Sequence, residues 1–456
     1  MSNRMAVIMA AGKGTRMKSS LYKVLHPICG LPMVEYVKRA TQESGVKDIV
    51  AVVGHGAEAV QEALGNSVHY ALQEEQLGTG HAVQQAAERL EGLSGHTLVI
   101  CGDTPLITGD TLNKLFEVHE SSGSKATVLT AIAEDSTGYG RIVRNAQGHV
   151  ERIVEETDAT DEERLIKEIN TGTFVFDNEA LFKSLKNITN GNAQGEYYLT
   201  DVLGLLEEAG ETVSAYAMDN FEDAIGINDR IALAEATRLM RARIARRHMM
   251  NGVTFVNPAA TQIEADVTIG QDTVIETGVS LKGKTTIGKN CFIGVNSEIY
   301  ASEIADNVSI TQSTIEESFI DENTGVGPYA HVRPASTIGK NVDIGNFVEI
   351  KNSILGDNTK SAHLTYIGDA TIGRNVNIGS GTIFVNYDGV NKHRAIVGDD
   401  SFIGCNSNIL SPVTVGDRSF IAAGTTLTDD VPDEALAISR TDQINIAKYW
   451  QKLQKK

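Results

Sequence analysis

The sequence predicts two domains of different fold class: a doubly wound α/β domain over residues 1–228 and a parallel β-helix over residues 251–456. The first prediction rests on short apolar segments that alternate with amphipathic ones, as in α/β proteins. The second rests on aliphatic residues that recur every six positions from Ile263 to about Leu427. A helix repeats every 3.6 residues and a half-buried strand every two, so a period of six indicates the coils of a β-helix.

The α/β prediction places its elements in the first domain as follows. Strands are expected at residues 5–11, 48–53, 97–101, 126–133 and 172–176, and amphipathic helices at residues 31–44, 80–91 and 110–121. In such folds, ligands bind at the carboxyl ends of the strands. The segments that directly follow the strands are therefore the candidates for a binding site.

A glycine-rich turn, Gly12-Lys13-Gly14-Thr15-Arg16-Met17, follows the first predicted strand. It lacks the third glycine of the dinucleotide fingerprint and the G-K-[ST] ending of a Walker A loop. Its flexible backbone, with Lys13, Arg16 and Lys23 nearby, suits the binding of phosphates. A purely structural turn is an equally open interpretation at this point.

The period of six is kept in three runs of the second domain. The aliphatic residues are Ile263, Ile269, Ile275, Leu281, Ile287, Ile293 and Ile299, then Ile320, Val326, Val332, Ile338, Ile344 and Ile350, then Val397, Ile403, Ile409, Val415, Ile421 and Leu427. A sandwich of short strands would not hold this phase for so long. With three hexapeptides per coil, the segment forms roughly nine coils, and at about 4.8 Å per coil a rod on the order of 45 Å long.

Polar residues interrupt this pattern in two places. Residues 356–366 carry Lys360, His363 and Tyr366, and residues 385–395 insert a loop that carries Asn386, Tyr387, Asp388, Gly389, Lys392 and His393. Polar segments at breaks in a solenoid repeat indicate a surface site. The alternative is that the rod serves only to assemble subunits.

Two helical segments complete the chain. Residues 229–250 carry alternating alanine, leucine and arginine and predict a solvated helix that spaces the two domains, with a stop at Asn251-Gly252. Residues 444–456 predict a short basic helix that packs on the open end of the β-helix, because solenoids need a cap.

Composition limits the function classes. A net charge of −19 argues against nonspecific nucleic-acid binding and against an anionic membrane surface. No run approaches 18 apolar residues, and the four cysteines show no CxxC spacing. We therefore expect a cytoplasmic protein with small-molecule substrates and with neither nucleic acid nor a membrane as partner.

The motifs of the first domain resemble those of the sugar nucleotidylyltransferase family. They are Ala10-Ala11-Gly12-Lys13-Gly14-Thr15-Arg16-Met17, Gln76-Leu77-Gly78-Thr79-Gly80-His81-Ala82, Gly102-Asp103-Thr104-Pro105-Leu106, Thr137-Gly138-Tyr139-Gly140-Arg141-Ile142 and Glu168-Ile169-Asn170-Thr171-Gly172. Joined to a hexapeptide β-helix, this order resembles a bacterial family of bifunctional enzymes over nearly the whole chain. The resemblance implies a mixed sheet in the first domain and a left-handed β-helix in the second.

The same resemblance implies two reactions of UDP-N-acetylglucosamine synthesis for cell-wall precursors. The second domain would acetylate glucosamine 1-phosphate with acetyl-CoA. The first would then transfer UMP from UTP to N-acetylglucosamine 1-phosphate and release pyrophosphate. The family further implies Mg²⁺ as cofactor and a homotrimer with sites shared between subunits.

For the nucleotide site, the attacking phosphate oxygen is already anionic, so the protein has to supply alignment and charge neutralisation. Asp103, at the end of a predicted strand, suits a Mg²⁺ ligand, although a helix N-cap is the alternative for such an aspartate. By resemblance, Asn228 is the second ligand, and Arg16 and Lys23 neutralise phosphate charge in catalysis. The residues implied to bind UTP and the nucleotide sugar are Ala10, Ala11, Gly12, Lys23, Gln73, Gly78, Thr79, Gly102, Asp103, Gly140, Glu155, Asn170 and Asn228.

Acetyl transfer needs a proton acceptor for the amine, and His363 suits this role with Glu349 orienting its imidazole. A lone histidine is more often structural, and the resemblance of Ala362-His363-Leu364 and Tyr366 to the acetyltransferase selects this one. The residues implied to bind glucosamine 1-phosphate are Arg333, Lys351, Tyr366 and Asn377. Those implied to bind acetyl-CoA are Ser380, Asn386, Tyr387, Cys405, Ala423 and Arg440.

Two other interpretations remain at this stage. One is a nucleotidylyltransferase whose rod only assembles subunits. The other is a nonenzymatic nucleotide-sensing scaffold.

Overall fold

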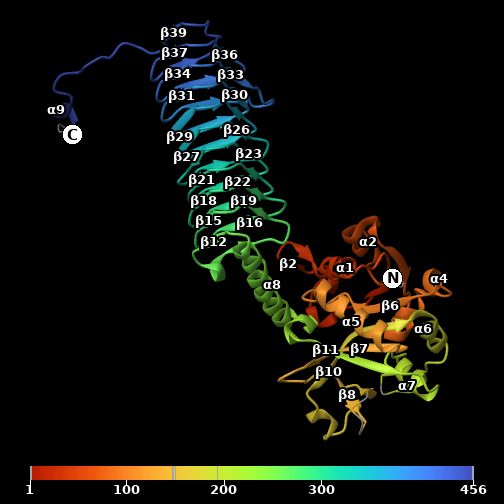
Figure 1. Ribbon diagram of the computed structural model, residues 1–456. Helices are drawn as coiled ribbons and strands as arrows, with labels where there is room; N and C mark the ends of the chain where they lie inside the picture. Colours follow the sequence, from red (N-terminus) through yellow and green to blue (C-terminus); the bar gives the residue numbers. More distant parts are fainter. Residues whose placement is uncertain (1–2, 146–147, 149, 193, 454–456) are drawn as a thin grey trace. The chain divides into compact units, whose positions relative to one another are not determined.

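The computed structural model describes residues 3–145, 148, 150–192 and 194–453 (Figure 1). The chain divides into two compact units, Met1–Met240 and Arg241–Lys456. The division falls inside helix α8, Arg230–Met250, which matches the helix predicted at residues 229–250. Each unit is described by itself.

A mixed sheet organises the first unit. Its strands are β1 (Arg4–Ala10), β4 (Asp48–Val53), β5 (His69–Leu72), β6 (His96–Cys101), β7 (Ala126–Ile132), β8 (Gly140–Arg144), β9 (Val150–Val154), β10 (Glu168–Asp177) and β11 (Val213–Ala217). The strand order is β11-β7-β10-β6-β1-β4-β5, with β8 and β9 off this path. Central β1 pairs in parallel with β4 on one side and β6 on the other, so the winding reverses at β1. Such a reversal opens a crevice at the carboxyl ends of the strands.

Helices cover both faces of this sheet. They are α1 (Met33–Glu43), α2 (Ala57–Leu64), α3 (Thr79–Gln84), α4 (Ala87–Leu90), α5 (Gly109–Ser122), α6 (Asn178–Leu185) and α7 (Asp201–Glu208). Alternate residues of β1 enter two separate cores: Ala6 and Ile8 pack with residues of α1 and α5, and Met5 and Val7 with residues of α6 and α7. Burial on both faces explains why β1 reads as an unbroken apolar run.

The predicted α/β class is confirmed, and the five predicted strands lie within or across β1, β4, β6, β7 and β10. The single helix predicted at residues 80–91 is wrong: the segment forms the short helices α3 and α4. Small elements complete the unit: β2 (Pro27–Ile28), β3 (Leu31–Pro32), η1 (Thr15–Met17), η2 (Lys23–Leu25), η3 (Gly65–Ser67), η4 (Glu163–Leu165) and η5 (Phe221–Ala224).

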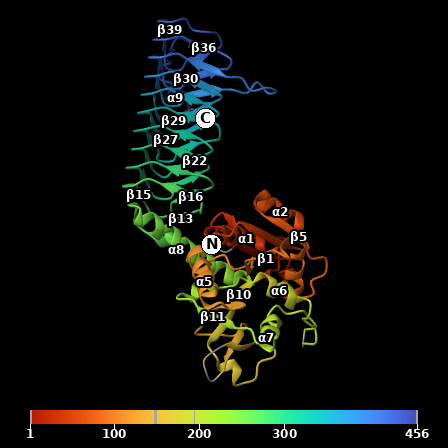
Figure 2. The same cartoon turned by 45° about the vertical axis from the view of Figure 1, so that its right-hand side comes forward.

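The second unit is a parallel β-helix, drawn as the stack of short arrows in Figures 1 and 2. Within the described residues one face is a nine-stranded sheet: β14 (Thr268–Ile269), β17 (Thr286–Ile287), β20 (Glu303–Ile304), β23 (Phe319–Ile320), β26 (Thr337–Ile338), β28 (Ile354–Leu355), β30 (Ala370–Ile372), β33 (Ala395–Val397) and β36 (Thr414–Val415). One strand per coil agrees with the roughly nine coils expected from the repeat.

The other two faces form one continuous sheet, because β27 and β29 each run around a corner without a break. Its strands are β12 (Thr254–Phe255), β13 (Gln262–Ile263), β15 (Val274–Ile275), β16 (Ser280–Lys282), β18 (Phe292–Ile293), β19 (Glu298–Tyr300), β21 (Ser309–Ile310), β22 (Thr314–Glu316), β24 (Gly325–Val326), β25 (His331–Val332), β27 (Asp343–Lys351), β29 (Lys360–Gly368), β31 (Asn377–Ile378), β32 (Ile383–Val385), β34 (Phe402–Ile403), β35 (Asn408–Leu410), β37 (Phe420–Ile421), β38 (Thr426–Leu427) and β39 (Leu436–Ala437). A 3-10 turn, η6 (Pro258–Ala260), lies in the first coil.

The residues of the six-residue period point into the core as predicted: all are buried except Ile269, which is half-buried. The apparent break at residues 356–366 is not a loop, because β29 continues through most of it. There, buried Ser361 takes the inward position that other coils give to an aliphatic residue. The break at residues 385–395 is a loop, which connects β32 to β33 and projects from the stack in both views (Figures 1 and 2).

The end of the chain differs from its prediction. Helix α9 spans only Tyr449–Leu453, and it buries no residue. All described residues after Ala437 are exposed, so the expectation that this segment caps the β-helix within the chain is wrong. Residues 454–456 of the predicted helix lie outside the described residues. None of the helices in the described part of the chain combines the length and the apolar character that a bilayer crossing requires.

Candidate active sites

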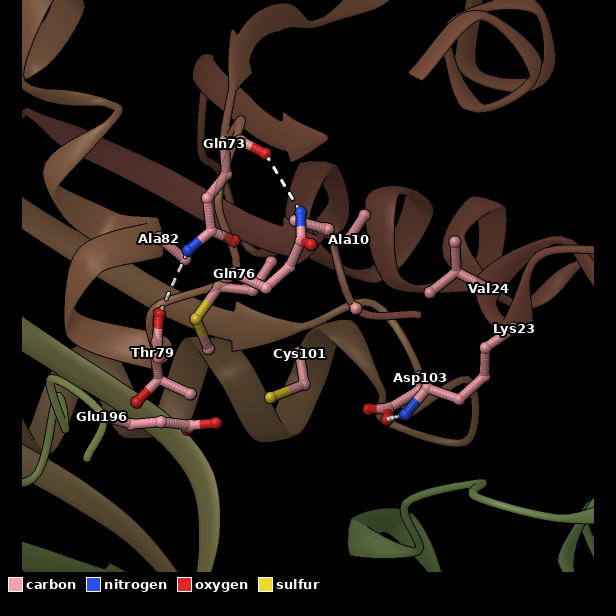
Figure 3. Close-up of a pocket in the computed structure, with 14 residues that line it drawn as sticks. Ala10, Lys23, Val24, Gln73, Gln76, Thr79, Ala82, Cys101, Asp103 and Glu196 are labelled. Atoms are coloured by element: carbon pink, nitrogen blue, oxygen red, sulfur yellow. Dashed lines mark hydrogen bonds and ion pairs between the residues drawn. The ribbon is translucent and has the colours of Figure 1, made fainter. Parts of the chain in front are cut away.

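A cavity of about 260 Å³ opens where β1 and β6 end (Figure 3). The parallel pairing of Met9 with Cys101 brings the two strand ends together, and the Gly102 N–H donates to the Met9 carbonyl at 2.9 Å. Residues of the glycine-rich turn and of the Gly102-Asp103 motif therefore face the same crevice. Among the predicted residues, the cavity is lined by Ala10, Ala11, Gly12, Lys23, Gln73, Gly78, Thr79 and Asp103.

The Lys23 ammonium donates to two side-chain oxygens of this site. It forms a short ion pair with the Asp103 carboxylate (Figure 3). It also donates to Asn228 Oδ1 at 3.1 Å. Arg16 Nη2 also donates to Asn228 Oδ1, at 2.9 Å. The four residues named for phosphate and metal binding are thus joined in one network.

This network suits a magnesium ion. Within the described residues, no group of three or more His, Cys, Asp or Glu side chains could hold a metal by itself. Mg²⁺, however, prefers one or two protein oxygens completed by substrate phosphates and water. Asp103 and Asn228 offer such a pair, and they already face a cation.

Gln73, Gly78 and Thr79 form the opposite side of the cavity. Gln73 is almost fully buried, and its Nε2 donates to the Gly78 carbonyl at 3.2 Å. Gly78 has φ 114°, and a Cβ there would lie 2.6 Å from the Tyr197 carbonyl oxygen, so only glycine fits. Thr79 Oγ1 accepts the Leu199 N–H at 3.0 Å. The loop before α3 is therefore held in place by the segment around residues 197–199.

Gly140, Glu155 and Asn170 form a second group in the same unit. A Cβ on Gly140 would lie 3.4 Å from Glu155 Oε2 and 3.5 Å from Asn170 Cβ. Asn170 pairs with Gly140 across β8 and β10, and its Oδ1 accepts the Gly172 N–H. Burial, aided by Asp158 and Asp201, raises the pKa of Glu155. A half-buried carboxyl and an amide thus lie beside a residue without a side chain.

Sequence reasoning missed several residues of the cavity, among them Gln76, Cys101 and Glu196. Burial raises the pKa of the Cys101 thiol to about 12, which favours the protonated, unreactive thiol at neutral pH. Glu196 comes from an irregular segment whose sequence carries no periodic signal. Gln76 lies inside a quoted motif, and its Nε2 donates to the Gln73 carbonyl at 3.2 Å (Figure 3).

In the β-helix, His363 lies beside Asn346 of the preceding coil. The two residues pair across β27 and β29, with 3.1 Å between His363 Nδ1 and Asn346 Oδ1. Glu349, which was expected to orient the imidazole, instead pairs with Arg333 at 2.9 Å. Asn346, a residue that the sequence did not single out, thus lies within hydrogen-bond distance of the imidazole.

Four of the six residues predicted for acetyl-CoA form a column on one corner of the β-helix. The Asn406 N–H donates to the Ser380 carbonyl and the Gly424 N–H to the Cys405 carbonyl, so these corners stack coil upon coil. A Cβ on Gly379 would meet the Cys405 backbone, and one on Gly404 would meet the Ala423 backbone. Arg440 Nη1 donates to the Ala423 carbonyl at 3.0 Å. Ser380, Cys405, Ala423 and Arg440 thus continue the row that Asn346 and His363 begin.

Tyr366, Asn386, Lys351 and Arg333 form a second group on the neighbouring face. A Cβ on Gly368 would lie 2.5 Å from Tyr366 Oη and 2.7 Å from Asn386 Nδ2, which places these side chains together. Lys351 and Arg333 lie near them, one and two coils away. Tyr387 is exposed on the β32–β33 loop, and its Oη donates to the Gly389 carbonyl.

Asn377 does not join this group within one chain. It pairs with Lys360 and Phe402, which belong to a different face of the β-helix from Tyr366 and Lys351. The four residues predicted for glucosamine 1-phosphate are therefore divided between two faces.

Models of known families match both units. The nucleotidyl transferase family matches residues 5–236, half of the chain. The six-repeat bacterial transferase hexapeptide family matches residues 266–301 and 394–429, and the GMPPB C-terminal domain matches residues 314–390.

Curated proteins match the chain over its full length. The chain is 57% identical to the bifunctional protein GlmU of Geobacillus thermodenitrificans over 456 residues, which is 100% of this chain and 99% of that protein. It is 56% identical to bifunctional GlmU proteins of Listeria monocytogenes and Listeria innocua, over 98% of each chain. The matches of this chain thus cover both its α/β nucleotidyltransferase unit and its hexapeptide β-helix. The chain belongs to the GlmU family, bifunctional uridylyltransferase and acetyltransferase enzymes of UDP-N-acetylglucosamine synthesis.

Proposed function

We propose that each unit carries one of the two reactions. Residues 1–228 transfer UMP from UTP to N-acetylglucosamine 1-phosphate, residues 229–250 link the domains, and residues 251–456 acetylate glucosamine 1-phosphate with acetyl-CoA. The observation that carries this assignment is that the described site residues form separate clusters, with nucleotide residues in one unit and the histidine row in the other.

For uridylyl transfer, the sugar phosphate oxygen attacks the α-phosphorus of UTP, and pyrophosphate leaves. The backbone of Ala10, Ala11 and Gly12 lies beside the phosphates, and Arg16 and Lys23 neutralise their charge. Asp103 and Asn228 hold Mg²⁺, which when bound neutralises phosphate charge and aligns the reactants. Gln73, Gly78 and Thr79 bind the uracil, and Gly140, Glu155 and Asn170 bind the sugar.

For acetyl transfer, the amine nitrogen of glucosamine 1-phosphate attacks the thioester carbonyl, the C–S bond breaks and CoA leaves as its thiol. Asn346 Oδ1 can only accept a hydrogen bond, so the facing His363 Nδ1 carries a proton. This leaves the Nε2 lone pair of His363 to accept the proton of the amine. Arg333 and Lys351 bind the 1-phosphate, and Glu349 holds Arg333 in place.

The substrate groups extend from His363 in two directions. Acetyl-CoA binds along the corner row of Ser380, Cys405, Ala423 and Arg440, with Asn386 and Tyr387 near the thioester. The sugar binds against Tyr366 and Asn377. Because Asn377 lies on another face, we propose that a second copy of the chain completes the sugar site in a homotrimer.

Exposed apolar residues support assembly at this corner. Tyr329, Phe347 and Leu364 are 54%, 57% and 61% exposed, and the rings of Tyr329 and Phe347 stack at 5.5 Å. All three have positive φ, a backbone conformation that bulky residues rarely adopt. Burial against a second copy accounts for large apolar side chains at such strained positions beside His363. We place the enzyme in the cytoplasm, where its co-substrates UTP and acetyl-CoA are produced.

The test uses two variants of the full chain assayed for both reactions. Asp103→Asn should lose uridylyl transfer, measured as Mg²⁺-dependent pyrophosphate release, and keep acetyl transfer, measured as free CoA thiol. His363→Ala should show the reverse. Full acetylation by His363→Ala would remove this histidine from the mechanism. Absence of CoA release by the unaltered chain would leave the rod with an assembly role alone.

A further inference from the structure

Asp369 is a nearly buried carboxylate at a corner of the β-helix, 6% exposed and with φ 49°. Left-handed backbone favours Gly, Asn and Asp. Asn would satisfy this preference without a charge, so the backbone alone does not explain why the residue here is charged. At the corresponding corner of the preceding coil the chain has Asn352, also with positive φ. A buried charge is costly unless it is well paired, so the partners of Asp369 are informative.

Three side chains direct their N–H groups at this carboxylate. Asn352 Nδ2 donates to Oδ1 at 2.6 Å, and Lys351 Nζ lies 3.3 Å from Oδ2. Asn386 Nδ2, from the β32–β33 loop, donates to Oδ2 in a short hydrogen bond. Lys351 and Asn386 both belong to the proposed acetyl-transfer site, whereas Asp369 has no assigned role there.

The carboxylate determines the orientation of the Asn386 amide. An ionised carboxylate only accepts hydrogen bonds, so the amide must turn its NH₂ end toward Asp369. With Nδ2 directed at Asp369 and 3.5 Å from Tyr366 Oη, the Asn386 Oδ1 is turned away from Asp369 and is available as an acceptor for a substrate. An acceptor at this position suits the N–H of an attacking amine and does not suit a thioester oxygen.

Asp369 is ionised and lies among cations. Burial would raise its pKa, but the hydrogen bonds from Asn352, Asn386 and Lys351 outweigh burial and lower it. The nearby Lys351 ammonium lowers the pKa of Lys392, and Arg333 adds to this effect. Asp369 therefore offsets part of the positive charge that gathers for the sugar phosphate.

We propose that Asp369 is a positioning residue for acetyl transfer, which fixes the Asn386 amide with its oxygen toward the amine of glucosamine 1-phosphate. This inference rests on the proposed acetyl transfer in the β-helix. It predicts that loss of Asp369 lowers kcat while KM changes little, because orientation affects the reacting amine more than the phosphate.

The test is Asp369→Asn, which keeps size and the preference for positive φ, so the fold is retained. The kcat for CoA release should fall about 10- to 100-fold, because the new amide can present NH₂ and no longer fixes Asn386. The KM for glucosamine 1-phosphate should stay constant or fall, since a negative charge leaves the phosphate site. Uridylyl transfer by the same molecules is the internal control.

Asp399→Asn is the matched control variant. Asp399 is likewise a carboxylate of the β-helix paired with a cation: it accepts from the Arg374 backbone N–H and from Arg374 Nη2. The Asp399→Asn variant should keep kcat and KM within about twofold of the unaltered chain. A double variant gives the second readout: if Asp369 acts through Asn386, adding Asp369→Asn to Asn386→Ala should lower kcat by less than threefold more.

Three results would overturn the proposal. These are an Asp369→Asn enzyme with kcat within twofold of the unaltered chain, a KM that rises along with a lower melting temperature, and losses that multiply fully in the double variant. If the unaltered chain released no CoA, the proposed acetyl transfer would itself fail, and the role of Asp369 with it. The first three results leave acetyl transfer in place, so the two failures are distinguishable.

Discussion

At the scale of single residues, the Lys23 ammonium is an internal cation held by the two oxygens assigned to Mg²⁺. The side chains of Lys23 and Asp103 are each 16% exposed, so water screens their ion pair only in part. A metal ion arriving without nucleotide has to displace this ammonium. When phosphates are present, they offer Lys23 an alternative partner, which favours binding of metal and nucleotide together.

Replacing Lys23 with methionine should therefore raise the affinity for Mn²⁺ in the absence of nucleotide, by about tenfold for an ion pair of this burial. Electron paramagnetic resonance of free Mn²⁺ measures this directly. Lys13→Met is the control, because Lys13 is exposed in the nearby glycine-rich turn and its loss removes the same charge. Equal affinities of the two variants would show that Lys23 does not compete with the metal.

A second residue-scale prediction concerns His119, a buried histidine of α5. Its Nδ1 lies 2.9 Å from Thr127 Oγ1 and its Nε2 lies 3.2 Å from His96 Nδ1. Burial, aided by His96 and opposed by Asp177 and Glu120, lowers the pKa of His119 to about 4. The folded state thus prefers the neutral imidazole, whereas an unfolded histidine titrates near pH 6.5.

The neutral His119 contributes stability that is fully present above pH 6.5 and is lost as the pH falls toward 4. Between pH 7.5 and 5 the loss amounts to about 2 kcal/mol. The free energy of unfolding in urea should be measured for the unaltered chain and for His119→Gln. The difference between the two should shrink at acidic pH, since glutamine keeps a polar group without titrating. A difference that is constant with pH would assign the acid sensitivity to other groups.

At the scale of elements, the corner that joins the two halves of β27 depends on Gly345. A Cβ there would lie 1.8 Å from the Ala362 carbonyl oxygen of the next coil, next to the Asn346–His363 pair. Gly345→Ala should destabilise the β-helix by about 2 kcal/mol and reduce acetyl transfer, because the coils must separate. In the neighbouring coil, Gly325→Ala meets no atom closer than 3.9 Å and should change stability by less than about 0.5 kcal/mol. Similar melting temperatures for the two variants, measured by calorimetry, would contradict this account.

The sequence predicted the elements whose pattern repeats. The aliphatic period fixed which residues of the β-helix point inward, and apolar runs located β1, β4, β6 and β7. The sequence did not predict the partner of His363, because this pairing depends on the length of one coil. Asn346 precedes His363 by 17 residues, not 18, so a count of whole hexapeptides misses it.

Contacts outside the repeat were also not predicted, because no local sequence pattern encodes them. Glu196 reaches the nucleotide cavity on a segment fixed by the Leu77 and Tyr197 backbones, which no local pattern encodes. Asp369 occupies a corner position where the sequence shows only a small polar residue, and its importance lies in partners from two other segments.

At the scale of the whole molecule, we predict that acetyl transfer depends on the assembly of subunits and that uridylyl transfer does not. The nucleotide cavity is formed within one unit of one chain, whereas the residues proposed for glucosamine 1-phosphate are divided between two faces of the β-helix. Loss of the proposed trimer should therefore abolish acetyl transfer and leave uridylyl transfer nearly unchanged.

Phe347→Lys tests this difference, because it places a charge in the middle of the exposed row of Tyr329, Phe347 and Leu364 without touching the core. We expect monomers in analytical ultracentrifugation and a fall in CoA release of at least about tenfold, since burying a lysine at an interface costs several kcal/mol. Ile354→Lys is the matched control: Ile354 is 47% exposed on the nine-stranded face, and its replacement should leave trimers and both activities intact. Monomeric Phe347→Lys with full acetyl transfer would mean that one chain builds the whole site, and that Asn377 has no part in binding the sugar.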